Sequence, residues 1–233
     1  MDRRSFLGSC SATAACLSAV SGASWAANAR AKEYARVLLV DERGDPLKAA
    51  ALKPQTNYVF NYPFEATPVF LLDLGKAVAP NTLTTEDRQS YVWPGGVGRQ
   101  HSVVAFSAIC AHQLVYPTHD VSFISFRKTR AQRGVQDGLI HCCAEHSQYD
   151  PARGAEVLSG PARQPLCAVL LQHDPATDSL AAYGTLGGEL FDRFFEKYAL
   201  KLSLDVGPKA HNAVAGQAVV RELDRYCKNP IQC

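Results

Sequence analysis

Two short stretches rich in cysteine and histidine, far apart along the chain, constrain its fold more than any other feature. The first, residues 109–112, reads ICAH, and the second, residues 139–150, reads LIHCCAEHSQYD. Clusters of Cys and His this dense are typical of metal sites, whose ligands are brought together by folding. Any fold of this chain therefore has to bring the two stretches side by side.

Each stretch supplies one Cys and one His at short spacing, namely Cys110 with His112 and Cys143 with His146. A structural zinc finger normally pairs Cys with Cys and His with His. The mixed pattern suits a [2Fe–2S] cluster with two Cys on one iron and two His on the other. A zinc ion held by the same four side chains is the alternative. The C-x-x-H spacing favours Cys143 as the second thiolate, and Cys142 replaces it if the register shifts by one residue.

At these residues the sequence resembles the Rieske iron–sulfur proteins, over about residues 103–186. The resemblance continues after the second ligand pair, in the stretch SQYDPARGAEVLSGPA. It implies one [2Fe–2S] cluster on the four side chains named above, hydrogen bonds to its sulfurs from Ser147 and Tyr149, and a covering loop that contains Gly160 and Pro161. The family usually has a Gly after the second His. Here Ser147 follows directly, so Ser147 and Tyr149 each stand one position early.

Short β-branched and aromatic runs, separated by Pro and Gly, precede and follow the cysteine-rich stretches. Runs at this spacing predict a mostly β fold, an antiparallel sandwich or barrel. The resemblance implies a Rieske domain over residues 32–187, with a cluster-binding subdomain at about 103–165 inserted in it. Residues 188–233 are expected to form a helical extension. ELFDRFFEKYAL carries an aromatic stripe at helical spacing, and NAVAGQAVVRELDRY is a second, weaker helical stretch. The stripe either packs on its own domain or docks a partner.

Residues 1–31 are expected to be an export signal. MDRRSFLG carries Arg3 and Arg4 ahead of an uncharged stretch at 5–28, and ANA at 27–29 is a cleavage candidate. This pattern looks like a twin-arginine signal, which predicts a periplasmic protein. The uncharged stretch is long enough to span a membrane, but Ala, Ser and Gly dominate it, so cleavage is favoured over a retained anchor.

Export brings the remaining thiols into an oxidising compartment. Besides the expected ligands, the mature chain contains Cys142, Cys167, Cys227 and Cys233. The Asn-Pro step between the last two can reverse the chain, so Cys227–Cys233 is the favoured disulfide. The Rieske proteins of cytochrome bc complexes carry a further Cys in each half-site, joined beside the cluster. This chain lacks both, so no disulfide is expected next to its cluster.

The resemblance and the export signal together predict an electron-transfer subunit with no catalytic residues of its own. Its donor would be quinol, beside a cytochrome b, or the catalytic subunit of a molybdenum oxidoreductase, and its acceptor a c-type cytochrome. Because this chain lacks the additional Cys of each half-site, the molybdenum oxidoreductase is slightly favoured over a quinol–cytochrome c reductase. The net charge of +2 argues against a nucleic-acid partner. The basic segment RKTRAQR, residues 127–133, is either a solvated loop or a rim that steers an acidic redox partner.

The export signal makes a direct prediction. Replacing Arg3 and Arg4 together by Lys should leave the precursor in the cytoplasm, because the paired arginines are the address that the twin-arginine route reads. Fractionation followed by immunoblotting measures this. Normal accumulation of the double variant in the periplasm would contradict the interpretation.

Overall fold

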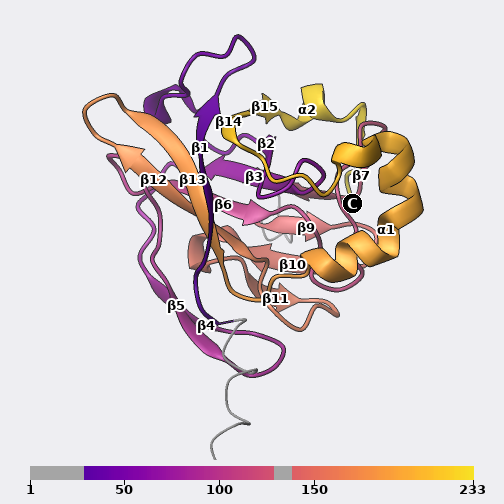
Figure 1. Cartoon of the computed structure of the whole chain (residues 1–233). Helices are drawn as coiled ribbons and strands as arrows, with labels where there is room; N and C mark the ends of the chain where they lie inside the picture. The colour runs from indigo at the N-terminus through magenta and orange to yellow at the C-terminus, as the bar shows by residue number, and fades with distance from the viewer. Residues whose placement is uncertain (1–28, 129–137) are drawn as a thin grey trace, which may run out of the picture.

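The computed structural model describes residues 29–128 and 138–233, which fold mostly into β-strands (Figure 1). Nearly all of the expected export signal, and Arg130 and Arg133 of the basic segment, lie outside the described residues. The main sheet has eight strands in the order β14–β1–β13–β12–β6–β3–β2–β15. Their bounds are β1 Lys32–Val40, β2 Tyr58–Asn61, β3 Pro68–Asp73, β6 Val103–Ser107, β12 Ala168–Asp174, β13 Ser179–Leu186, β14 Gly216–Val219 and β15 Arg221–Glu222.

This sheet is antiparallel except where β14 runs parallel to β1. Strand β14 also lies near β2, so the sheet curls towards a barrel. The mostly β fold predicted from the sequence is confirmed. Two of the apolar runs that follow the cysteine-rich stretches, PLCAVLLQHD and SLAAYGTL, form the β12–β13 hairpin.

A second, four-stranded sheet is inserted in the chain between β6 and β12. Its strands are β8 Ile124–Phe126, β9 Ile140–Cys142, β10 Ser147–Asp150 and β11 Glu156–Ser159, in the order β11–β10–β9–β8. Two strand pairs flank the sheets: β4 Asn81–Thr84 with β5 Ser90–Trp93, and β7 Val121–Ser122 with β16 Asn229–Pro230. The small sheet contains the second Cys/His stretch and lies within the subdomain expected at about 103–165.

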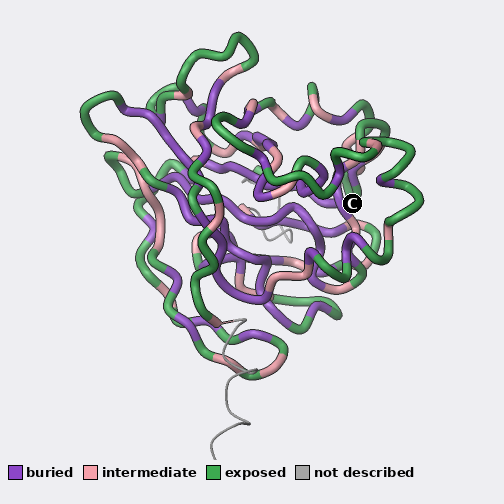
Figure 2. The backbone as a smooth tube through the Cα atoms, in the orientation of Figure 1, coloured by how far each residue is buried: buried purple, intermediate pink, exposed green. Residues whose placement is uncertain are grey.

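Strand β3 shows how the main sheet joins two hydrophobic cores. Val69 and Leu71 belong to the core inside the curled sheet, whereas Phe70 and Leu72 face the other core, shared with the small sheet. Successive side chains of a strand point to opposite faces, so a strand buried on both faces reads as a continuous apolar run. Figure 2 shows buried backbone along the central strands. The second core also contains Cys110 and Cys142, so packing brings the two Cys-bearing segments together.

The aromatic stripe of the tail packs on its own domain. Helix α1, Phe191–Asp205, buries Phe191, Phe194 and Phe195 against the segment that follows Cys110, including Leu114 and Tyr116. The Phe194 and Tyr116 rings meet edge to face, with centroids 4.9 Å apart. The chain that leaves the first half-site is thereby held by the helix.

The second helical stretch predicted in the tail is largely wrong. Its residues form strands β14 and β15, and only the single turn α2, Leu223–Tyr226, is helical. Gly216 has φ +73°, outside the helical region, and adjacent valines favour a strand that can add to the free edge of β1. Three single 3-10 turns complete the described structure: Ala49–Ala51, Pro151–Arg153 and Gly207–Lys209.

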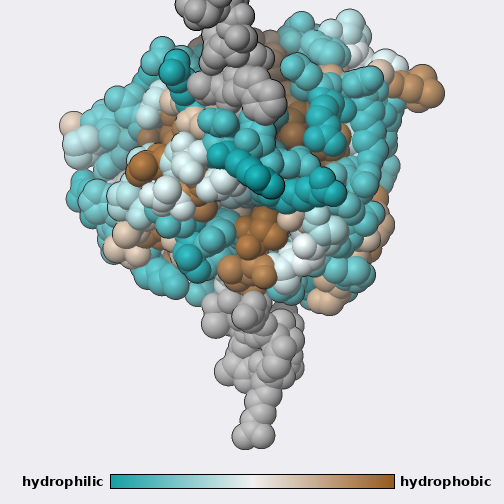
Figure 3. All heavy atoms as spheres, turned by 90° about the horizontal axis from the view of Figure 1, so that it is seen from below, coloured by the Kyte–Doolittle hydropathy of each residue, from teal (hydrophilic) through white to brown (hydrophobic). Residues whose placement is uncertain are grey.

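The surface seen from below is mainly hydrophilic, and its hydrophobic residues form small groups (Figure 3). Leu200 and Leu204 are the most exposed large hydrophobic residues of the described chain and lie on the outer side of α1. Among the described residues, no helix combines the length and apolar character that a membrane span requires.

Helix α1 offers a matched test of the packing. Phe194→Ala should lower the free energy of unfolding by about 3–5 kcal/mol, because it opens a cavity under a fully buried ring. Leu204→Ala on the same helix should change it by less than about 0.5 kcal/mol, because Leu204 is 77% exposed. Urea denaturation measures both values. Equal effects of the two substitutions would contradict the packing described.

Candidate metal centre

The first half-site is a tight turn that follows strand β6. Its backbone closes through the Leu114 N–H, which donates to the Cys110 carbonyl at 2.9 Å, and the Cys110 N–H, which donates to Val115 at 2.8 Å. Leu114 adopts φ +60°, which lets the chain turn back within these few residues. Cys110 is fully buried, so its thiol points into the core shared with the small sheet.

The second half-site is the turn of the β9–β10 hairpin. Cys142 ends β9 opposite Ser147, and the His146 N–H donates to the Cys142 carbonyl at 2.7 Å. His146 closes the turn with φ +58° and is exposed. Cys142, the last residue of β9, is buried, whereas Cys143, the first residue of the turn, is only half-buried.

Tyr149 joins the two half-sites. Its ring is fully buried, and its hydroxyl lies 3.3 Å from Cys110 Sγ and accepts the Ala111 N–H at 3.1 Å. Since the hydroxyl oxygen already accepts from Ala111, its own proton is available to donate to the sulfur. The sequence places Tyr149 one position early for a hydrogen bond to a cluster sulfur. In the structure its hydroxyl nevertheless reaches a cysteine of the first half-site.

The two buried thiols, Cys110 and Cys142, share one proton. The pKa of Cys110 is lowered to about 6, chiefly because the Cys142 thiol donates a hydrogen bond to it. Burial opposes this shift. The Tyr149 hydroxyl and the backbone N–H groups of His112 and Gln113 add to it. The pKa of Cys142 is raised, because it keeps the shared proton and is buried. Cys110 is thus the thiolate of the pair, with its negative charge held by hydrogen-bond donors.

The imidazole of His112 faces a carboxylate. His112 Nδ1 lies 3.6 Å from Glu145 Oε2, and the two side chains are 27% and 37% exposed. That Nδ1 is itself buried and has no hydrogen-bond partner among the described residues. The expected partner of His112 in the second half-site was His146, whose side chain is exposed.

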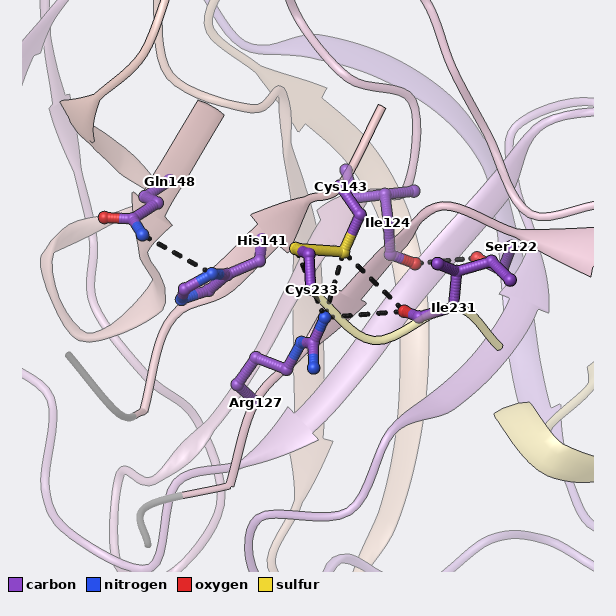
Figure 4. The surroundings of a disulfide bond; sticks show 8 residues. All are labelled: Ser122, Ile124, Arg127, His141, Cys143, Gln148, Ile231 and Cys233. Atoms are coloured by element: carbon purple, nitrogen blue, oxygen red, sulfur yellow. Dashed lines mark hydrogen bonds between the residues drawn. A yellow bond between two sulfur atoms is a disulfide. The ribbon is translucent and has the colours of Figure 1, made fainter. Parts of the chain in front are cut away.

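Cys143 is bonded to another residue. Its sulfur forms a disulfide with Cys233, with the two Cα atoms 5.5 Å apart (Figure 4). The favoured Cys227–Cys233 pair was wrong, since Cys227 is a free, buried thiol. The expectation of no disulfide beside the site was also wrong. A bridge exists there, although it joins the second half-site to the C-terminus instead of joining the two half-sites.

The C-terminal segment reaches this position because β16 pairs with β7 and the Ile231 N–H donates to Ser122 at 2.8 Å. The Arg127 guanidinium points at the disulfide and donates to Cys143 Sγ at 2.9 Å and to the Ile231 carbonyl at 3.4 Å (Figure 4). Arg127, the first residue of the basic segment, therefore binds the bridge instead of standing free in solvent.

The predicted covering loop lies against the end of the second half-site. A Cβ on Gly160, which has φ +89°, would lie 2.5 Å from the His146 carbonyl oxygen, so only glycine fits here. Pro161 beside it is exposed. The Ala162 N–H donates to Ser147 Oγ at 3.2 Å. This bond ties the loop to Ser147, and the Ser147 hydroxyl proton is left to donate elsewhere.

The donors at the site come as two pairs, Cys110 with Cys142 and His112 with Glu145. No group of three or more His, Cys, Asp or Glu side chains is arranged around a single point among the described residues. Glu145, which the sequence analysis did not single out, lies beside His112, and Cys142, the alternative to Cys143, lies beside Cys110. The sequence signal that points to Cys142 is its spacing from Tyr149, whose hydroxyl lies 3.3 Å from Cys110 Sγ.

Among known proteins, no protein-family model matches the chain. A solved structure that does match is the soluble domain of Rieske protein II from Sulfolobus acidocaldarius, with a TM-score of 0.46 and 23% sequence identity. The match covers 67% of this chain and 82% of that one.

The disulfide makes a prediction about stability. Cys233→Ser should lower the free energy of unfolding by about 2–4 kcal/mol, because the bridge closes a loop between residues 90 positions apart. Chemically reduced wild-type protein is the control and should match the variant in denaturant titrations. A peptide map of the oxidised protein should contain a Cys143–Cys233 cross-link, and a Cys227–Cys233 cross-link would contradict the pairing.

Proposed function

We propose that this chain is an exported electron-transfer protein that carries a Rieske-type [2Fe–2S] cluster between its two half-sites. The observation that carries the proposal is the Tyr149 hydroxyl, 3.3 Å from Cys110 Sγ, beside a buried pair of thiols. The cluster would be held by Cys110 and Cys142 on one iron and by His112 on the other. Such a cluster, when bound, takes up and releases single electrons.

The donor chemistry of the site fits this group. A two-iron cluster takes two protein donors on each iron, and the site offers its donors as two pairs. His112 Nδ1 is a buried nitrogen without a hydrogen-bond partner among the described residues, as expected of an atom reserved for a metal. Cys110, with its pKa lowered to about 6, is already a thiolate at neutral pH.

The surrounding residues prepare the site for electron transfer. Tyr149 donates to Cys110, and backbone N–H groups of both turns point at the two sulfurs, which stabilises negative charge there. His112 is 27% exposed, so its imidazole forms an edge that a partner protein can approach. The opposite side of the site is closed by the hydrophobic core, which excludes water from the thiolates.

A structural zinc protein is the second candidate, since zinc also accepts Cys, His and carboxylate ligands. One zinc ion needs its donors arranged tetrahedrally around a single point. The division of the donors into two pairs therefore favours the cluster. Iron, acid-labile sulfide and zinc contents of the purified protein decide between the two candidates.

The electron partners are proposed from the same site. A donor such as quinol beside a cytochrome b, or the catalytic subunit of a molybdenum oxidoreductase, would meet the chain at the exposed edge of His112, and a c-type cytochrome would accept the electron. The export signal expected at residues 1–31 supports a periplasmic location. Mixing the reduced protein with a periplasmic c-type cytochrome and following cytochrome reduction by absorbance tests the acceptor.

Serine variants of the two adjacent cysteines test the ligand assignment. Cys142→Ser should abolish the EPR signal of the reduced cluster, because it removes a thiolate ligand. Cys143→Ser should keep the signal and resemble Cys233→Ser, since both remove only the disulfide. The reverse result, with signal lost in Cys143→Ser and kept in Cys142→Ser, would restore the assignment that the C-x-x-H spacing favours.

Tyr149→Phe should lower the midpoint potential of the cluster. The lost hydrogen bond stabilises the more negative, reduced state, so its removal makes reduction harder. The expected fall is a few tens of millivolts, since about 60 mV corresponds to 1.4 kcal/mol in a one-electron couple. Protein-film voltammetry measures it. An unchanged potential would show that the hydroxyl does not donate to a ligand sulfur.

A further inference from the structure

The register of the second half-site changes which residue stands at the fourth ligand position. When Cys142 faces Cys110, the C-x-x spacing that led from Cys143 to His146 leads instead from Cys142 to Glu145. The hairpin supports this register twice, since Cys142 pairs with Ser147 across the strands and Tyr149 reaches Cys110. His146 then stands one position beyond the ligand position.

The geometry of the turn also places Glu145, and not His146, at the fourth ligand position. Glu145 Oε2 lies 3.6 Å from Nδ1 of His112, the buried nitrogen that has no hydrogen-bond partner among the described residues. The contacts of His146 are made by its backbone. It closes the turn at φ +58°, its N–H donates to the Cys142 carbonyl, and Gly160 lies against its carbonyl oxygen. Its side chain is exposed.

We infer that the Glu145 carboxylate, and not the His146 imidazole, is the fourth ligand, so that the cluster is held by two Cys, one His and one Glu. This inference rests on the proposed function. Carboxylate oxygen and imidazole nitrogen bind iron side by side in other protein sites, so the pair is chemically competent. It also explains why a carboxylate faces a buried imidazole nitrogen that has no hydrogen-bond partner in the part of the chain that the structure describes.

A glutamate ligand changes the electrostatics of the cluster. A carboxylate brings a negative charge where a second neutral imidazole would bring none, so the reduced cluster is disfavoured. The midpoint potential should therefore lie lower than with His at this position. Only one histidine nitrogen should be bonded to iron.

The experiment counts those nitrogens in the exported, intact protein. Pulsed EPR of the reduced wild-type protein, compared with protein labelled by heavy-nitrogen histidine, should show strong coupling to one histidine. Glu145→His should add a second coupled nitrogen and raise the midpoint potential. His146→Asn should leave the spectrum unchanged, since Asn tolerates the left-handed backbone and removes only the imidazole.

Two coupled histidines in the wild type, falling to one in His146→Asn, would overturn the inference while leaving the proposed function intact. A wild-type protein without iron and sulfide would overturn the proposed function itself. The decisive count is made on the wild type, so it does not depend on any variant folding.

Discussion

The hydrogen bond between the Tyr149 hydroxyl and Cys110 is the contact on which the candidate centre depends. It is made across the core by a strand of the small sheet to the turn that follows strand β6 of the main sheet. Moving Tyr149 by one position along β10 would turn its ring to the other face of the strand, because side chains alternate. The contact therefore fixes the register of the whole hairpin, and with it which residues of the turn face the first half-site.

The disulfide completes this arrangement from outside the hairpin. Cys142 ends β9 inside the core, and the next residue, Cys143, lies half-buried in the turn, where it meets the C-terminal Cys233. The bridge ties the turn to β16, and the Arg127 guanidinium holds the sulfur and the Ile231 carbonyl beside it. A turn whose side chains must hold fixed positions is thus braced on its outer side by a covalent bond to the end of the chain.

The parts predicted well from the sequence are those set by local pattern. Apolar runs such as β3, the β12–β13 pair and the aromatic stripe of α1 follow from periodicity, and each is present. The tail after α1 was mispredicted because Gly216 and the valines around it respond to a free sheet edge, which no local window contains. Strand pairing of that kind is a tertiary effect that outweighs weak helical propensity.

In the candidate site, too, some residues could be predicted from the sequence and others could not. The two stretches that form it, and Cys110, His112 and Tyr149 within them, could be identified from residue type and spacing. The choice between adjacent residues could not, because Cys142 and Cys143 have the same chemistry and differ only in position: Cys142 ends strand β9 inside the core, whereas Cys143 begins the turn. The Cys143–Cys233 pair was also out of reach, since the cysteines are 90 residues apart and meet only through β16 and β7.

Burial of the two thiols sets an energetic condition on the candidate site. A thiolate removed from water costs free energy unless hydrogen bonds or an opposite charge compensate for it. Among the described residues, the charge on Cys110 is held by a shared proton, the Tyr149 hydroxyl and backbone N–H groups, and the Cys142 thiol keeps its proton. A bound metal centre would release that proton and leave two thiolates, each already met by N–H groups of its own turn. The polar groups around the sulfurs are therefore arranged for more negative charge than the protein alone carries.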